Sequence, residues 1–274
     1  MSWDRQITIK SQHEIDVMKI AGRINAEALQ AAYEAIRPGV TTADLNAAAE
    51  EVLKKYGVIS PFLGVPGPIP YPASTTVSVN EILVHGIPGN LVLKEGDIVS
   101  VDCGTLYEGF VADSAFSASV GEVSPKAKKL LEVTERSLYL GIEKMVAGNT
   151  IGDVSAAVQT YVESNGFHVV REYTGHGVGR TMHEGPQVPN YGNPGTGMVL
   201  RPGMTIALEP MVLVGTHRTR VQRDGWAVSS ADGSLTAHFE HSVAVTENGP
   251  VILTLLGDGK APAQIAGQVW REQL

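Results

Sequence analysis

The chain has 274 residues, of which 43% are hydrophobic and 18% charged, so it is long and apolar enough to bury a large core. Its formal net charge of −8 and its lack of a Lys- or Arg-rich run argue against nucleic acid as the main partner, because phosphate binding needs clustered positive charge. The single cysteine, Cys103, excludes an intramolecular disulfide and a cysteine-rich zinc site.

The N-terminal residues and the hydropathy of the chain predict a cytoplasmic protein. Residues 1–14 lack the apolar core of a signal peptide. No run approaches the roughly 20 apolar residues that a membrane-spanning helix needs. We therefore expect no membrane partner.

Four helices are predicted from their capping signals. Capping boxes, with Ser or Thr at the N-cap and an acidic residue three positions later, begin at Ser11, Thr41 and Thr150. Ser124, followed by proline at the first helical position, marks another helix start. In chain order, the helices are expected to end before Pro38, at Gly57, near residue 146 and near Gly166.

Apolar alternation predicts strands between and after these helices. Residues 97–103 and 110–120 indicate a hairpin around a turn at residues 107–109. Residues 60–76 contain five prolines and two glycines, a composition that regular structure does not tolerate. Other strands are expected at residues 8–10, in a run ending at His85, within 167–173, within 201–215, and as three segments across 221–255.

Two stretches of the chain resemble each other. Residues 36–57 align without a gap to residues 145–166, with matching Gly, Thr, Asp and Ala positions. Helix caps reuse Gly, Thr and Asp, so convergence also explains this match. Downstream, however, both copies continue with a strand, a His-Gly pair and two acidic strands. We therefore expect two similar α/β halves, about 10–123 and 124–256, around a pseudo-twofold axis.

Four carboxylates occupy equivalent places in these halves. Asp102 stands opposite Glu209, and Asp113 stands opposite Glu240. Each lies in or beside an apolar run, where an unpaired buried charge is costly. Few basic residues lie near them, so two divalent cations would neutralise the group. With His176 as the only nitrogen, this oxygen-rich set suits Mn, Fe(II), Co or Zn, and it indicates metal-assisted hydrolysis.

The other histidines allow a functional and a structural interpretation. His85 and His183 flank glycines and could donate to a carbonyl or a developing oxyanion. Structural hydrogen bonding would explain bare histidines, but the Gly/Pro context and the repeat favour function. His241 alternates away from Glu240 and is expected to be structural, while Trp226 fits a pocket wall or the core. The sequence gives no indication of a function for the remaining histidines, His13, His168, His217 and His238.

Five ordered motifs carry a family resemblance. They are NEILVHGIP, DIVSVDCGTLYEGFVADSAFS, REYTGHGVGRTMHEGP, MTIALEPM and HFEHSVAVTENG. With them, the chain from about residue 10 to 255 resembles the type I methionine aminopeptidases, which are M24 metallopeptidases of the pita-bread fold. A type II insertion between His183 and Glu209 and a Cys/His-rich N-terminal zinc extension are both absent, which favours type I.

The resemblance implies a fold class and a domain organisation. The fold would be α+β, with two pseudo-symmetric α/β halves and a central curved antiparallel sheet. Residues 1–256 would form a single catalytic domain. Residues 257–274 would be a polar tail, either loose or a short helix.

The resemblance also implies the metal ligands. Asp113 and Glu240 would bridge two divalent cations, which could be Co, Mn, Fe or Zn. Asp102 would complete the ligands of one cation, and His176 with Glu209 would complete those of the other.

The remaining site residues would act on the substrate. By the same resemblance, His85 and His183 would hold the scissile peptide and stabilise the tetrahedral intermediate, with Glu209 as a proton shuttle. Tyr71 and Trp226 would line the methionine pocket.

Around this pocket the chain departs from the usual family pattern. Residues 61–73 are longer and richer in proline, Phe62 and Thr76 stand where cysteines are common, and Met182 stands where phenylalanine is frequent.

The implied activity is removal of the initiator methionine from nascent polypeptides, near the ribosome, when the second residue is small. The protein would act as a monomer without DNA. One alternative is a proline-specific aminopeptidase or prolidase, which usually carries a large additional N-terminal domain. Another is a non-catalytic pita-bread binding protein, which would have lost metal ligands.

Overall fold

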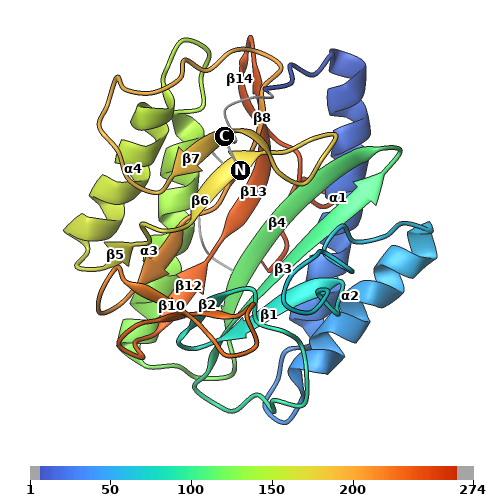
Figure 1. Ribbon diagram of the computed structural model, residues 1–274, viewed down its shortest axis with the longest axis vertical. Coiled ribbons are helices and arrows are strands. Elements are labelled where there is room, and N and C mark those ends of the chain that lie inside the picture. The colour runs from blue at the N-terminus through green and yellow to red at the C-terminus, as the bar shows by residue number, and fades with distance from the viewer. Residues whose placement is uncertain (1–6, 264–274) are drawn as a thin grey trace.

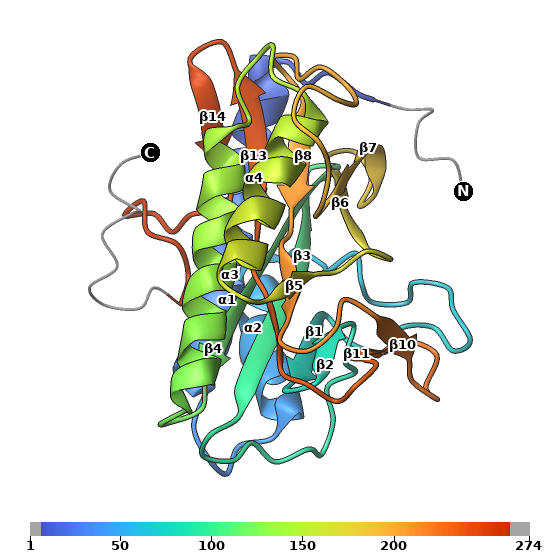
Figure 2. The same cartoon turned by 90° about the vertical axis from the view of Figure 1, so that its left-hand side faces the viewer.

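The computed structural model describes residues 7–263, which form a curved central sheet with four helices on one of its faces (Figure 1; Figure 2). The helices are α1 (Gln12–Ala35), α2 (Thr42–Tyr56), α3 (Pro125–Glu143) and α4 (Ile151–Ser164). α1 packs on α2, and α3 packs on α4, so two helical pairs lie side by side behind the sheet. None of the described helices has the length and apolar character that crossing a membrane requires.

The predicted capping signals start these helices. Ser11, Thr41 and Thr150 each accept a hydrogen bond from the backbone N–H three residues on, and the acidic side chain there accepts one from the cap backbone. Ser124 caps α3, with proline following it. α3 ends at Glu143 rather than near residue 146, because the next N–H groups bond back only three residues and form turns.

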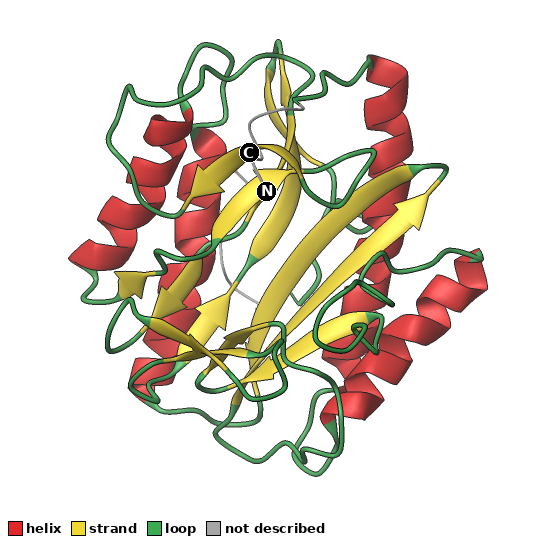
Figure 3. Ribbon diagram, in the orientation of Figure 1, coloured by secondary structure: helices red, strands yellow, loops and turns green. Residues whose placement is uncertain are grey.

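The largest sheet of the described chain is antiparallel (Figure 3). Its strands are β1 (Thr75–Val79), β3 (Ile98–Tyr107), β4 (Phe110–Ser119), β6 (Thr174–Gly177), β7 (Glu184–Pro189), β8 (Thr205–Leu208), β13 (Glu240–Thr246) and β14 (Gly249–Ile252). They are ordered β1-β3-β4-β13-β8-β6-β7, with β14 paired to β13. A late strand, β13, therefore lies at the centre, between β4 and β8.

Two smaller sheets flank the large one. The first contains β10 (Thr219–Val221), β11 (Val228–Ser230) and β2 (Ile82–Val84), in that order. The second contains β12 (Thr236–His238), β9 (Met211–Leu213) and β5 (His168–Val169), in that order. Each joins segments that are far apart in the sequence.

The β3–β4 hairpin is longer than predicted. β3 continues past residue 103 to Tyr107, which pairs with Phe110, so the expected three-residue turn contains only Glu108 and Gly109. Both have positive φ, 46° and 81°, as two-residue hairpin turns require. Gly104 continues the strand by pairing with Asp113. Glycine is needed at this position because a Cβ there would lie 2.8 Å from the Pro61 side chain that packs over it.

Two predicted strands are interrupted. The run ending at His85 divides into β1 and β2, because Asn80 between them has a left-handed φ of 55°. The run within 201–215 divides into β8 and β9 around Pro210, which has no N–H for the ladder.

Two other predictions were wrong, and a third lies partly outside the described residues. Residues 8–10 form no strand, although the Lys10 N–H bonds to the Gly203 carbonyl. The segment 221–255 holds β11 to β14, four strands rather than three. Of the expected tail, residues 264–274 lie outside the described residues.

The sheet separates the core from a polar site. On β3, Val99, Val101 and Cys103 are buried in the main hydrophobic core with residues of the helices. Because successive strand side chains point to opposite faces, Asp102 faces away from this core. The site therefore forms on the face that the helices leave free.

Candidate functional site

The five groups singled out in the sequence come together from neighbouring strands. They are Asp102 on β3, Asp113 on β4, His176 on β6, Glu209 directly after β8, and Glu240 at the start of β13. β3, β4, β13, β8 and β6 are consecutive in the sheet. Sheet order, rather than closeness in sequence, thus assembles the cluster.

All five side chains line one cavity of about 170 Å³. His176 Nε2 lies 3.5 Å from Glu209 Oε1 and 3.8 Å from Asp113 Oδ2. One possible ligand atom each from Asp113, His176 and Glu240 lies within 4.8 Å of the others. This spacing is suitable for a shared metal ion.

Burial makes the ionised carboxylates costly at this site. It raises the pKa of Asp102 to about 7. Burial, followed by repulsion from the neighbouring acids, raises the pKa of Asp113, Glu209 and Glu240 well above the usual range. Only a nearby positive charge would keep all four ionised at neutral pH.

The protein itself does not supply that charge within residues 7–263. No Lys or Arg there forms an ion pair with any of the four acids; Arg171 pairs with Glu163, and Arg180 pairs with Glu14. Three carboxylate oxygens of the cluster are buried without a hydrogen-bond partner: Asp102 Oδ1, Asp113 Oδ1 and Glu240 Oε1. Buried acceptors in this condition fit metal cations, which prefer oxygen-rich ligand sets of this kind.

His176 has the protonation state that a metal ligand needs. Its Nδ1 lies 2.9 Å from the Gly177 carbonyl oxygen, which requires the proton on Nδ1 and leaves the Nε2 lone pair facing Asp113 and Glu209. Burial, with His183 nearby, lowers the pKa of His176 to about 3, so the ring is neutral at pH 7.

His85 and His183 also line the cavity. Burial, with His183 nearby, lowers the pKa of His85 to about 4, and burial lowers the pKa of His183. The His183 ring lies 4.4 Å from the His176 ring, centroid to centroid. Both histidines are therefore neutral side chains at the edge of the acidic cluster.

His238 belongs to the site, although it carried no signal in the sequence analysis. Its Nε2 lies 3.7 Å from Glu240 Oε2 and 3.8 Å from Glu209 Oε2, and this buried nitrogen has no hydrogen-bond partner. His238 ends β12 and Glu240 begins β13, so the two residues are separated only by Phe239. In extended chain, side chains two residues apart point the same way, a signal that could have found His238. His241 is structural as expected: its Nδ1 lies 2.8 Å from Thr254 Oγ1.

Two polar residues that sequence reasoning missed hold the backbone beside the acids. The Ser242 hydroxyl accepts from the Asp113 N–H at 2.9 Å and donates to the Asp113 carbonyl at 2.8 Å. The Asn25 amide, buried in α1, donates to the Cys103 carbonyl and accepts from the Ser114 hydroxyl at 2.5 Å. Their role depends on tertiary contacts, which no local pattern reveals.

One wall of the cavity is aromatic and apolar. Tyr71 and Trp226 pack edge to face with ring centroids 5.1 Å apart, which makes Trp226 a pocket residue rather than a core residue. The three residues that depart from the family pattern, Phe62, Thr76 and Met182, line the same cavity.

The proline-rich segment 61–73 closes against this wall. Trp226 Nε1 donates to the Ile69 carbonyl at 2.9 Å, and a Cβ on Gly67 would lie 2.3 Å from the Trp226 ring. This segment therefore sets the position of Trp226.

Sequence comparison finds close relatives over nearly the whole chain. The profile of metallopeptidase family M24 matches residues 16–247. Methionine aminopeptidases from Clostridium perfringens and Clostridium acetobutylicum are 48% and 50% identical over 250 residues, which cover 91% of this chain and 99% of each relative.

Solved structures agree with this result. A methionine aminopeptidase from Thermotoga maritima matches with a TM-score of 0.88 and 49% identity, covering 91% of this chain and 99% of its own. A prolidase from Pyrococcus horikoshii matches less well, with a TM-score of 0.70 and 26% identity, and only 63% of its chain is covered. The fold is the pita-bread fold expected from the sequence. The extent of these matches shows that the chain belongs to metallopeptidase family M24.

Proposed function

We propose that the protein removes the N-terminal methionine from polypeptides whose second residue is small. The observation that carries this proposal is a buried set of four carboxylates and one neutral imidazole, opening into a cavity with an aromatic wall. The relatives named methionine aminopeptidases support the choice of substrate.

Two divalent cations would be held by the five groups of the cluster. Asp113 and Glu240 would be ligands of both cations, Asp102 would be a ligand of one, and His176 with Glu209 would be ligands of the other. The unpartnered oxygens of Asp102, Asp113 and Glu240 support this assignment. Bound there, Mn, Fe, Co or Zn would lower the pKa of water and polarise the peptide carbonyl.

The protein side chains orient the peptide and move its protons. His85 and His183, both neutral, hold the scissile peptide by donating hydrogen bonds to its carbonyl and to the oxyanion that develops. Glu209 carries a proton from the attacking water to the nitrogen that leaves as the new amine.

The cavity suits methionine by its chemistry. Tyr71, Trp226, Met182 and Phe62 form an apolar wall beside the acidic cluster, against which an unbranched apolar side chain would pack. The Tyr71 hydroxyl donates to the backbone carbonyls of Thr75 and Gly86, so its ring is fixed before substrate binds. We further propose that the protein is a type I enzyme and a cytoplasmic monomer. It would act on nascent chains near the ribosome.

The test is hydrolysis of Met-Ala-Ser by protein that has been stripped with a chelator and then restored with Co, Mn, Fe(II) or Zn in separate samples. We expect activity only after restoration, and two equivalents of metal in a titration. Ala-Pro-Ser serves as the matched competitor. Faster cleavage of Ala-Pro-Ser would favour a prolidase-like enzyme, and no cleavage with any of the four metals would favour a binding protein.

A further inference from the structure

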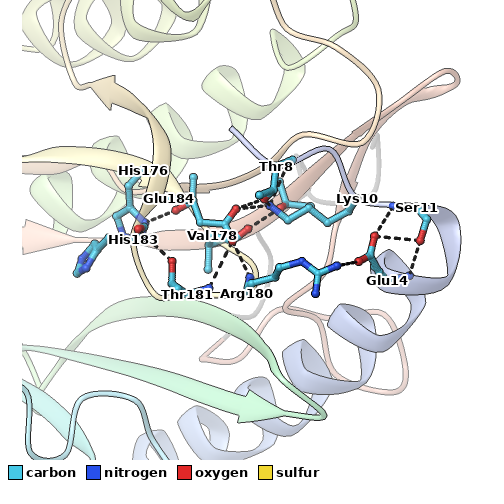
Figure 4. A network of polar contacts seen from close by, with 12 residues as sticks. Thr8, Lys10, Ser11, Glu14, His176, Val178, Arg180, Thr181, His183 and Glu184 are labelled. Carbon is cyan, nitrogen blue, oxygen red and sulfur yellow. Dashed lines mark hydrogen bonds and ion pairs between the residues drawn. The ribbon is translucent and has the colours of Figure 1, made fainter. Parts of the chain in front are cut away.

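A buried ion pair joins the segment before α1 to the loop that carries His183 (Figure 4). Lys10 Nζ lies 2.5 Å from Glu184 Oε2, and the two side chains are only 2% and 4% exposed. Glu184 directly follows His183 and begins β7. The pair is therefore one residue away from the cavity without lining it.

Glu184 organises the loop between the two cavity histidines. Its Oε1 accepts from the Arg180 N–H at 2.6 Å and from the Thr181 N–H at 3.4 Å. The Thr181 hydroxyl then donates to the His183 carbonyl at 3.2 Å. One carboxylate thus fixes the backbone of residues 180–184 from within, and His183 is part of that backbone (Figure 4).

Contacts with neighbouring residues place the Lys10 side chain beside Glu184. Its ammonium also lies 2.5 Å from the Thr8 hydroxyl, and its backbone N–H bonds to the Gly203 carbonyl at 2.8 Å. A Cβ on Gly179 would lie 2.3 Å from Lys10 Cε and 2.6 Å from Nζ. Glycine at 179 therefore leaves the path along which the lysine side chain enters the loop.

Loss of the Lys10 ammonium would leave the buried Glu184 carboxylate without its counter-charge, held only by hydrogen bonds from the Thr8 hydroxyl and from the Arg180 and Thr181 N–H groups. A buried charge in this state is much less favourable than the intact pair. Without the ammonium, the Glu184 carboxylate gains by moving toward water, and the loop that it holds must move with it. The His183 ring, which packs against His176, would then be displaced from its place in the cavity.

We propose that Lys10, acting through Glu184, is a positioning residue that fixes His183 for hydrolysis. Lys10 itself touches neither the substrate nor the acidic cluster. This inference rests on the proposed function, in which His183 stabilises the tetrahedral intermediate.

The test is a double-mutant cycle between Lys10→Met and His183→Ala, with kcat and KM measured on Met-Ala-Ser. In the wild-type background, Lys10→Met should lower kcat about 10- to 100-fold with KM within about twofold, because displacement of a transition-state contact acts on kcat. In the His183→Ala background, the same change should alter kcat by less than about twofold. Equal losses in both backgrounds would overturn the proposal.

Gly179→Ala provides an independent variant, because its Cβ displaces the lysine without removing its charge. It should reproduce the kcat loss of Lys10→Met, and it keeps the test open if Lys10→Met does not fold. Lys10→Arg should restore at least part of kcat, because the charge pair is kept.

Leu45→Ala is the control for lost stability, since Leu45 is fully buried in α2 and contacts none of these residues. Leu45→Ala should lower the melting temperature about as much as Lys10→Met does, yet keep the wild-type kcat. A kcat loss in Leu45→Ala equal to that in Lys10→Met would overturn the proposal. Wild-type protein inactive on methionyl peptides would overturn the proposed function and this inference together. Active wild type with unaffected Lys10→Met would overturn this inference alone.

Discussion

Two serine hydroxyls join β4 to residues 238 and 242, on either side of its short ladder with β13. The two strands pair directly only at Glu240 with Ala115 and at His241 with Ser114. Ser242 on β13 binds the N–H and the carbonyl of Asp113, as described above. Ser117 on β4 makes the equivalent pair with His238, accepting from its N–H at 2.9 Å and donating to its carbonyl at 2.8 Å.

This arrangement predicts the effect of Ser242→Ala. The change leaves one buried N–H and one buried carbonyl without a partner, and each unsatisfied group costs about 1–3 kcal/mol. With partial relaxation of the strands, we expect the free energy of unfolding to fall by about 2–4 kcal/mol. Urea titrations of metal-free protein measure this loss without the added stabilisation that a bound metal gives.

Ser117→Ala is the comparison variant, because it removes the same kind of bond between β4 and His238 at the end of β12, and His238 is not a proposed ligand. We expect a similar loss of stability. Metal affinity, measured by calorimetry, should separate the two variants. Ser242→Ala should weaken it about 10-fold or more, because Asp113 is a proposed ligand, whereas Ser117→Ala should change it by less than about threefold.

Two results would refute this reasoning. A stability loss below about 0.5 kcal/mol in Ser242→Ala, within the usual range of a surface substitution, would show that the hydroxyl is not needed to satisfy the backbone. Equal weakening of metal binding by both variants would show that Asp113 is not held specifically by Ser242.

Three further predictions concern the acids and the pocket. Asp113→Asn should abolish hydrolysis of Met-Ala-Ser, and full activity in this variant would contradict the two-cation proposal. In metal-free protein the buried histidines with lowered pKa oppose the acids below about pH 6.5, whereas above about pH 7 only the acids with raised pKa still bind more protons in the folded state. Stability should therefore fall as pH rises above about 7. Urea midpoints that rise over this range would contradict it, and added Mn should flatten the decline. Gly67→Ala should raise KM for Met-Ala-Ser more than it lowers kcat, since its Cβ would displace Trp226. Steady-state kinetics would check this, with Gly89→Ala as control because a Cβ there meets nothing within 4 Å.

Local signals predicted the helices, whereas tertiary contacts decided the details of the strands. The capping boxes at Ser11, Thr41 and Thr150 form within four residues, so the sequence suffices to find them. The break at Asn80 depends on a left-handed backbone that asparagine only sometimes adopts. The predicted strand stopped at residue 103, yet Gly104 continues β3 beneath Pro61.

The same division applies to the site. Asp102 and Glu209 could be singled out because carboxylates in apolar runs are costly wherever the chain folds. Ser242 and Asn25 could not, because a serine or an asparagine is ordinary in sequence and gains its role only from the strand or helix opposite. His238 lies between these cases: alternation with Glu240 places it on the site face, but only once the strand is known.

The central place of β13 in the sheet also constrains how the protein is made. Synthesis proceeds from the N-terminus, so β3 and β4 leave the ribosome long before β13 does. Until residues 240–246 emerge, β4 and β8 have no strand between them, and Glu240 is missing from the cluster. A nascent chain of this protein therefore has Asp102 and Asp113 without Glu240 while the 126 residues between Asp113 and Glu240 are synthesised. In the proposed function, metal binding by the complete cluster then follows the emergence of β13 and comes late in maturation.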